Sequence, residues 1–164
     1  MRLIVMLLSL LISAQSYAGE LAKPAGKALL TMTGNIENTT EEGKAVFDLA
    51  SLEKLGLVTF QTVSPWYNGR TTFTGVPMQK LMDYVGAKGT VVKVTALNDY
   101  TTVIPLSDFK KYNAILAVKV NGEYMHIRDK GPLFIVYPYD SIPELNNQIY
   151  YSRSAWQVNR MNIE

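Results

Sequence analysis

The stretch AILAVKVNGEYMHIRDKGPLFIVYP, residues 114–138, decides the fold because it sets two apolar strands around a charged loop. Residues 114–120 are apolar and rich in branched side chains, and Asn121 and Gly122 suit the two positive-φ positions of a type I′ turn, so residues 123–127 should return as the partner strand. Residues 128–132 are too charged and broken to continue it, and residues 133–137 form a second apolar run. We predict a charged loop between buried strands, a common place for binding and chemistry.

The first eighteen residues have the pattern of a signal peptide. Arg2 gives a positive start, residues 3–12 are apolar, and Ser16 and Ala18 place small residues at the positions that a signal peptidase reads. The apolar run is shorter than the roughly 20 residues of a spanning helix. We expect cleavage after Ala18 and a soluble, periplasmic or secreted single domain over residues 19–164.

Composition excludes several classes of function. The chain has no cysteine and one histidine, which removes thiolate nucleophiles, disulfide redox chemistry, thiolate zinc sites and iron–sulfur clusters. The single His126 rules out a multi-histidine metal site and leaves a Ser-His-Asp triad possible in principle. Without Arg2, 15 Lys and Arg face 14 Asp and Glu, a formal charge of +1 that argues against nucleic acid as a partner.

Short alternating runs elsewhere predict strands over residues 28–36, 45–49, 57–63, 91–97, 101–104 and 157–163. Three short helices are expected: one capped by Ser51 and ending at Gly56, one from Pro77 to Gly86, and one over residues 105–112. Residues 64–75 carry turn formers and read as a functional loop, and residues 138–148 as an irregular one. The fold class is therefore α+β, a compact, mixed and mostly-β domain with a few short helices.

A series of short motifs keeps a characteristic order and spacing along the second half of the chain. They are Phe73-Thr74-Gly75-Val76-Pro77-Met78, Asn98-Asp99-Tyr100 followed by Ile104-Pro105, Leu116-Ala117 with Asn121-Gly122, Gly131-Pro132-Leu133 with Ile135-Val136 and Pro138, and Trp156 with Val158. Together they resemble the molybdopterin-binding domain of the sulfite oxidase class of oxidoreductases. The resemblance implies the sulfite oxidase fold and a pterin cofactor carrying molybdenum, in enzymes that move oxygen atoms or reduce sulfoxides.

The sequence departs from the family at the metal. The resemblance implies that a cysteine thiolate before the Gly-Val-Pro helix holds the molybdenum, whereas residues 60–66 offer only the hydroxyls of Thr62 and Ser64. A hydroxyl is a poor substitute for a soft thiolate ligand. We therefore predict a non-catalytic small-ligand-binding or sensing accessory that acts with a membrane-bound signalling protein. The alternatives are a molybdopterin-dependent oxidoreductase with an unusual metal ligand, or a hydrolase built on His126 with a serine.

No catalytic residue is assigned, and ten residues are predicted to bind a small molecule or ion. They are Trp66, Tyr67, Arg70, Asp99, Tyr100, His126, Arg128, Lys130, Tyr139 and Arg153. The first three would form a cradle for a planar or anionic ligand, or simply pack a loop onto the core. Asp99 and Tyr100 would line the family's pocket or serve a turn.

The remaining candidates gather in two stretches. By strand alternation His126 shares a face with Tyr124, beside the charged residues 128–130, and is the best pH-sensitive group or else a surface histidine. Six side chains crowd the last thirty residues and would line a recognition surface or pack the core: Tyr137, Tyr139, Tyr150, Tyr151, Arg153 and Trp156. A hard-cation site from Glu123, Asp129, Asp140 and His126 is also conceivable from residue type.

Overall fold

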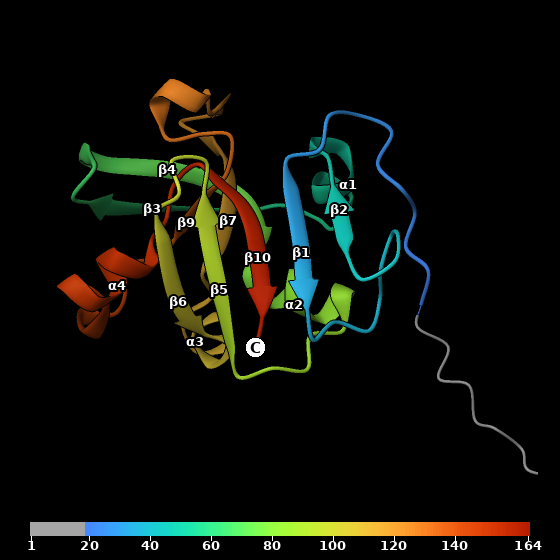
Figure 1. Cartoon of the computed structure of the whole chain (residues 1–164). Coiled ribbons are helices and arrows are strands. Elements are labelled where there is room, and N and C mark those ends of the chain that lie inside the picture. Colours follow the sequence, from blue (N-terminus) through green and yellow to red (C-terminus); the bar gives the residue numbers. More distant parts are fainter. Residues whose placement is uncertain (1–18) are drawn as a thin grey trace, which may run out of the picture.

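The computed structural model describes residues 19–164, so the predicted signal peptide lies outside the described residues. These residues form two five-stranded sheets with short helices around them (Figure 1). One sheet has the order β2-β1-β10-β5-β6 and consists of β1 (Leu30–Gly34), β2 (Ala45–Phe47), β5 (Val91–Ala96), β6 (Thr101–Pro105) and β10 (Val158–Ile163). The fold is the mostly-β α+β arrangement that the sequence predicts.

The last strand of the chain, β10, lies in the middle of the first sheet. β10 lies between β1, to which it is parallel, and β5, to which it is antiparallel, and Met32 stands opposite Met161. Both methionines are buried. The first and last strands therefore share one hydrophobic core.

The second sheet is built on residues 114–138. It has the order β3-β4-β7-β8, with β9 also paired to β7, and consists of β3 (Val58–Ser64), β4 (Tyr67–Pro77), β7 (Ile115–Val120), β8 (Glu123–Tyr124) and β9 (Phe134–Val136). Asn121 and Gly122 have φ values of 49° and 87°, which confirms the predicted turn with two positive φ angles. Every residue of β9 is buried.

Two predictions for this second sheet are wrong. β8 ends at Tyr124, because Met125 turns into the core and Ile127–Asp129 winds into a 3₁₀ turn, so Tyr124 and His126 do not share a strand face. Residues 64–75 are not a loop: Pro65 and Trp66 alone make the turn, and β4 continues with alternate burial through Thr71, Phe73 and Gly75. Strand pairing overrides the local turn formers here.

The first helix begins earlier than predicted. α1 (Leu49–Lys54) is capped by Asp48, whose carboxylate accepts from the Ser51 backbone N–H at 2.8 Å, so Ser51 is the third helical residue of a capping box rather than the cap. These hydrogen bonds lower the pKa of Asp48 to about 2. The other oxygen of the Asp48 carboxylate accepts from the Gly26 N–H at 2.7 Å, so the cap also ties the N-terminal segment to α1.

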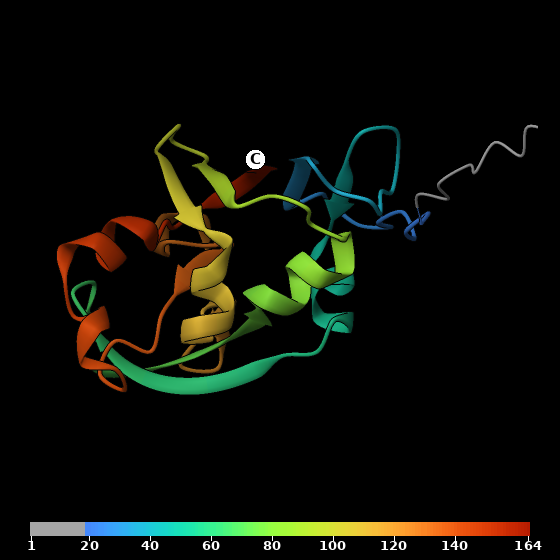
Figure 2. The ribbon, with the colours of Figure 1, turned by 90° about the horizontal axis from the view of Figure 1, so that it is seen from below.

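The other helices cover the core between and beside the sheets. α2 (Met78–Val85) buries the predicted stripe of Met78, Leu81, Met82 and Val85 and ends at Gly86, which has a φ of 61°. α3 (Leu106–Tyr112) lies beside α2 (Figure 2), and α4 (Gln148–Arg153) stands at the far end near β6. Across residues 19–164, no helix combines the length and apolar character needed to span a membrane.

Candidate functional site

A pocket lined by aromatic rings lies where the β3–β4 turn meets α4. We call it the aromatic pocket. Its volume is about 330 Å³, and its lining consists of Pro65, Trp66, Tyr100, Gln148, Tyr151, Ser152, Ser154 and Trp156. Both tryptophans of the chain are among these residues.

Trp66 is the centre of this pocket. Its ring centroid lies 5.3 Å from that of Phe134 and 5.8 Å from those of Tyr151 and Trp156, all in edge-to-face geometry. Such aromatic pairs are directional and hold the rings in place. Trp66 can take this position because the β3–β4 turn is only two residues long and ends against β9.

Tyr100 also lines the pocket and is held against α4. It follows the β5–β6 turn, in which Asp99 takes a φ of 63°, and its hydroxyl donates to the Ser152 carbonyl at 2.8 Å. α4 starts at Asn147, whose side chain accepts from the Ile149 N–H at 2.8 Å. Two separate elements, a turn and a capped helix, therefore set the width of the pocket.

The aromatic pocket is uncharged and offers the flat faces of aromatic rings. Its lining contains no charged side chain, and its polar groups are those of Gln148, Ser152 and Ser154 with the hydroxyls of Tyr100 and Tyr151. Aromatic faces with a few polar groups are typical of sites for small planar molecules. The pocket suits an uncharged planar ligand better than the anion considered from the sequence.

The ten predicted residues fall into three groups. Trp66 and Tyr100 line the aromatic pocket, and Tyr139 lies buried beneath Trp66, with its hydroxyl hydrogen-bonded to Ser154 Oγ. His126 and Arg128 are exposed on the 3₁₀ turn and do not line this pocket. The other five interact elsewhere.

Three of those five are held in ion pairs. Arg70 pairs with Asp140, Arg153 with Asp108 at 2.7 Å, and Asp99 with Arg160 at 3.2 Å. The Arg153 guanidinium shares the Asp108 carboxylate with the Tyr137 hydroxyl, which donates to it at 3.1 Å. The guanidinium groups of Arg70 and Arg153 each face a carboxylate, and the expectation that Arg70 helps to bind a planar or anionic ligand stays a prediction.

Tyr67 and Lys130 form a separate contact. The Lys130 ammonium lies 4.9 Å above the centroid of the Tyr67 ring, a cation–π arrangement. The Tyr67 hydroxyl is buried without a hydrogen-bond partner, and burial together with the negative charge of Asp129 raises its pKa. Neither residue lines the aromatic pocket.

The contribution of α4 to the pocket is not among the residues that the sequence predicts to bind a ligand. Gln148, Ser152 and Ser154 line the pocket with Tyr151, and of these four the sequence points only to the tyrosine, as one of the crowded aromatic residues. Residues 148, 151 and 152 follow the i, i+3, i+4 spacing of one helix face. That spacing would have shown them together, had residues 148–153 been predicted as a helix.

The proposed hard-cation site is not assembled. No three His, Asp or Glu side chains in residues 19–164 come close enough together to hold a metal ion. Asp140, one of the four suggested ligands, is held by Thr62 and Arg70. The hypothesis based on residue type is therefore wrong for the described residues.

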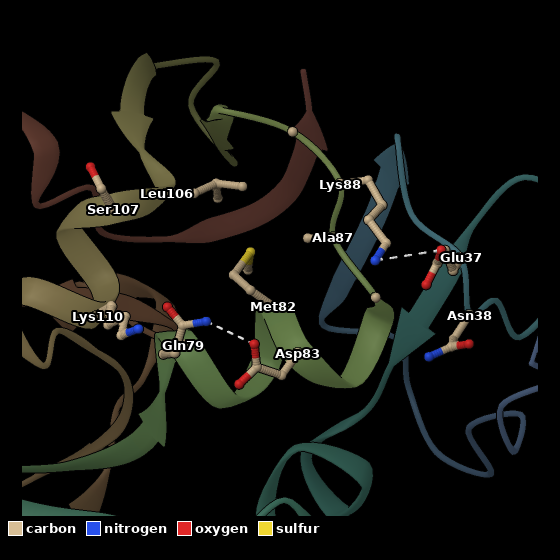
Figure 3. A pocket seen from close by; sticks show the side chains of 12 residues that line it. Glu37, Asn38, Gln79, Met82, Asp83, Ala87, Lys88, Leu106, Ser107 and Lys110 are labelled. Atoms are coloured by element: carbon tan, nitrogen blue, oxygen red, sulfur yellow. Dashed lines mark hydrogen bonds and ion pairs between the residues drawn. The ribbon is translucent and has the colours of Figure 1, made fainter.

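A larger hollow of about 500 Å³ lies between α2 and α3 (Figure 3). It contains none of the ten predicted residues, and its charged side chains are Glu37, Asp83, Lys88 and Lys110. The Lys88 ammonium lies 3.6 Å from the Glu37 carboxylate, and the Gln79 amide donates to Asp83 at 2.7 Å.

Comparison with known proteins identifies the family. The model of the oxidoreductase molybdopterin-binding domain matches residues 38–140, and a search of curated proteins gives no match. The chain belongs to the oxidoreductase molybdopterin-binding domain family. The match includes β3, the Pro65–Trp66 turn and β9, the elements that carry one wall of the aromatic pocket.

The residues of this family member do not fit the family's molybdenum cofactor. The Thr62 hydroxyl is fully buried, donates to Asp140 Oδ1 at 2.8 Å and accepts from the Asp140 N–H at 3.3 Å, so it is already engaged. The Ser64 hydroxyl is buried, has no partner, and is not part of the pocket lining. The lining also lacks the basic side chains that would hold a pterin phosphate.

Proposed function

We propose that this family member binds a small, planar, uncharged molecule in the aromatic pocket and performs no oxidoreductase reaction. The observation that carries the proposal is the lining of that pocket, which has a volume of about 330 Å³ and contains two tryptophans, two tyrosines and no charged side chain. The chain has no cysteine to supply the thiolate ligand of the family's enzymes. Binding without turnover is therefore the activity that its residues support.

The predicted export of the protein suggests a signalling role for this binding. The pattern of residues 1–18 predicts transport out of the cytoplasm, where a protein in the membrane can detect an occupied pocket and pass the signal to the cell. We therefore propose that the domain is a sensing accessory whose ligand-bound form is recognised by a membrane-bound signalling protein. The proposed location and the absence of a cysteine in the sequence are what support this partner.

Tryptophan fluorescence tests the binding directly, because Trp66 and Trp156 are the only tryptophans and both line the pocket. We expect at least one of three planar probes, free pterin, riboflavin or menadione, to quench the emission in a saturable manner. Tyr100→Ala should weaken that binding about fivefold to tenfold through the loss of one aromatic wall.

Tyr124→Ala is the matched control. Tyr124 and Tyr100 are equally exposed, at 45%, and each donates one hydroxyl hydrogen bond, but Tyr124 lies on β8 and donates to Glu53 at 2.7 Å. The control should bind the probe as the wild type does. Equal weakening by both substitutions, or no quenching by any probe, would refute the assignment of the pocket.

A second candidate function rests on Ser64. Its hydroxyl is buried and unpartnered, which is unusual for a native structure and leaves an oxygen free to bind a metal. On this reading the chain would be a molybdopterin-dependent oxidoreductase with a serine ligand. Ser64→Ala would then abolish molybdenum retention. Under our proposal neither the wild type nor the Ser64→Ala variant retains the metal.

A further inference from the structure

β3 is the outer strand of the second sheet, and its composition is unusual for such a position. Its seven residues, VTFQTVS, contain no charge and no proline, and Val58 and Val63 are 44% and 43% exposed. Figure 2 shows the strand running along the outside of the molecule. Uncharged edge strands invite pairing with another strand unless something blocks them.

The backbone groups of Gln61 point away from the sheet. Gln61 stands opposite Thr72 on β4. Thr72 directs its own backbone to the other side, because its N–H donates to Asn121 Oδ1 at 3.0 Å and its carbonyl accepts from the Asn121 N–H at 2.7 Å. The pair is therefore of the non-hydrogen-bonded kind, and the N–H and C=O of Gln61 face the open edge, as do those of Thr59 and Val63 by alternation.

Arg70 crosses this open edge. Arg70 stands opposite Val63, whose side chain is on the exposed face of the β3–β4 ribbon, whereas Asp140 hydrogen-bonds Thr62, whose side chain is on the buried face. The Arg70 guanidinium reaches the Asp140 carboxylate and donates to the Gln61 carbonyl at 3.3 Å on the way. We call Arg70, Asp140 and the Gln61 carbonyl the edge strap.

We propose that the edge strap prevents β3 from pairing with β3 of a second copy of this chain. A second copy is the occupant that fits, because antiparallel pairing about a two-fold axis at Gln61 places Gln61 opposite Gln61 and Thr59 opposite Val63. No like charges would oppose each other along the pair, and β-branched residues favour it. Within the strap, the Arg70 guanidinium binds the backbone of β3. Among the described residues it is the only charged group that binds an outward backbone group of this strand.

Arg70→Ala tests the proposal in the chain of residues 19–164. Sedimentation velocity over a concentration series should give a monomeric wild type and an Arg70→Ala protein whose dimer dissociation constant is at least about tenfold lower. Asp140→Asn breaks the same ion pair while leaving an acceptor for Thr62, and should shift the equilibrium in the same direction.

Arg160→Ala is the matched control. Arg160 is 59% exposed, as Arg70 is, and also pairs with an aspartate, but it lies on β10 inside the first sheet. This variant should remain monomeric. Its association to the same extent as Arg70→Ala would show a general effect of lost charge and overturn the proposal.

The site of association is tested by adding Gln61→Lys to Arg70→Ala. Two lysines would face each other across the proposed axis, and their repulsion should restore the monomer. Hydrogen exchange of the Arg70→Ala dimer should show slower exchange at the amides of Thr59, Gln61 and Val63. A folded Arg70→Ala protein that stays monomeric, or a dimer unaffected by Gln61→Lys, would overturn the proposal.

Discussion

The two faces of α4 show how one short helix serves two different purposes. One face turns Gln148 and Tyr151 toward the aromatic pocket, where the side chains leave a space of about 330 Å³. The other face turns Tyr150 and Arg153 into the protein, where Arg153 binds Asp108 and the Tyr150 hydroxyl lies 2.7 Å from that of Tyr112. Residues on the first face can bind something else, whereas residues on the second already bind one another.

This difference separates stability from recognition. Asp108 is only 6% exposed, and it is satisfied by Arg153 and Tyr137 together. A charge in such a place must keep its partner. Substitutions on the inner face of α4 should therefore affect unfolding, and those on the pocket face should affect binding.

The largest effect is expected for Arg153→Ala. Removing the guanidinium leaves the Asp108 carboxylate buried without its counter-ion, which should lower the free energy of unfolding by about 3 to 5 kcal/mol. Urea unfolding followed by circular dichroism measures this directly. The exposed pair of Arg160 and Asp99 provides a comparison, since Arg160→Ala should cost less than about 1 kcal/mol; equal losses in the two variants would erase the proposed difference between buried and exposed pairs.

The second largest effect is expected from alkaline pH, which should lower the free energy of unfolding through the buried tyrosines at the inner face of α4. Burial, and then the charge of Asp108, raises the pKa of Tyr137, and burial raises that of Tyr150. Because the pKa is higher in the folded state, the stabilisation is complete below the unfolded value of about 10 and is lost as the pH rises above it.

Tyr137→Phe sharpens this measurement. The substitution removes one of the groups that ionise on unfolding, so the urea midpoint should fall less steeply between about pH 9 and 11 than in the wild type. A wild-type midpoint that is constant over this range would contradict the account of the inner face.

The smallest effect on stability is expected for Gln148→Ala on the pocket face. Gln148 is exposed, so the free energy of unfolding should change by less than about 0.5 kcal/mol. Binding of the planar probe that quenches the wild type should nevertheless weaken severalfold, because Gln148 supplies one of the few polar groups of the lining. A marked loss of stability with unchanged binding would reverse the roles of the two faces.

The sequence predicts the framework well where patterns are local. The Asn121-Gly122 pair predicts the hairpin that contains β7. Helical spacing predicts the buried face of α2, which consists of Met78, Leu81, Met82 and Val85. The motifs from Phe73 onward predict the family, and the matched family model confirms it. Turn chemistry and helical periodicity depend on neighbouring residues, so they are visible in one dimension.

The candidate site is less predictable because it depends on contacts between distant residues. Trp66 and Tyr100 are found as aromatics beside turn formers, but nothing in the sequence shows that Arg70 pairs with Asp140 seventy positions away, or Arg153 with Asp108. The turn formers of residues 64–75 predict a loop, yet pairing with β3 and β7 makes a strand. Tertiary pairing overrides local preference in that segment.

The most direct test of the central claim is native mass spectrometry with elemental analysis, on protein exported from a host that makes molybdopterin. We predict a protein free of molybdenum and of a pterin cofactor mass, because no thiolate exists to bind the metal, Thr62 is engaged by Asp140, and the aromatic pocket lacks basic groups. About one molybdenum and one pterin cofactor per chain would contradict the account and direct attention to Ser64.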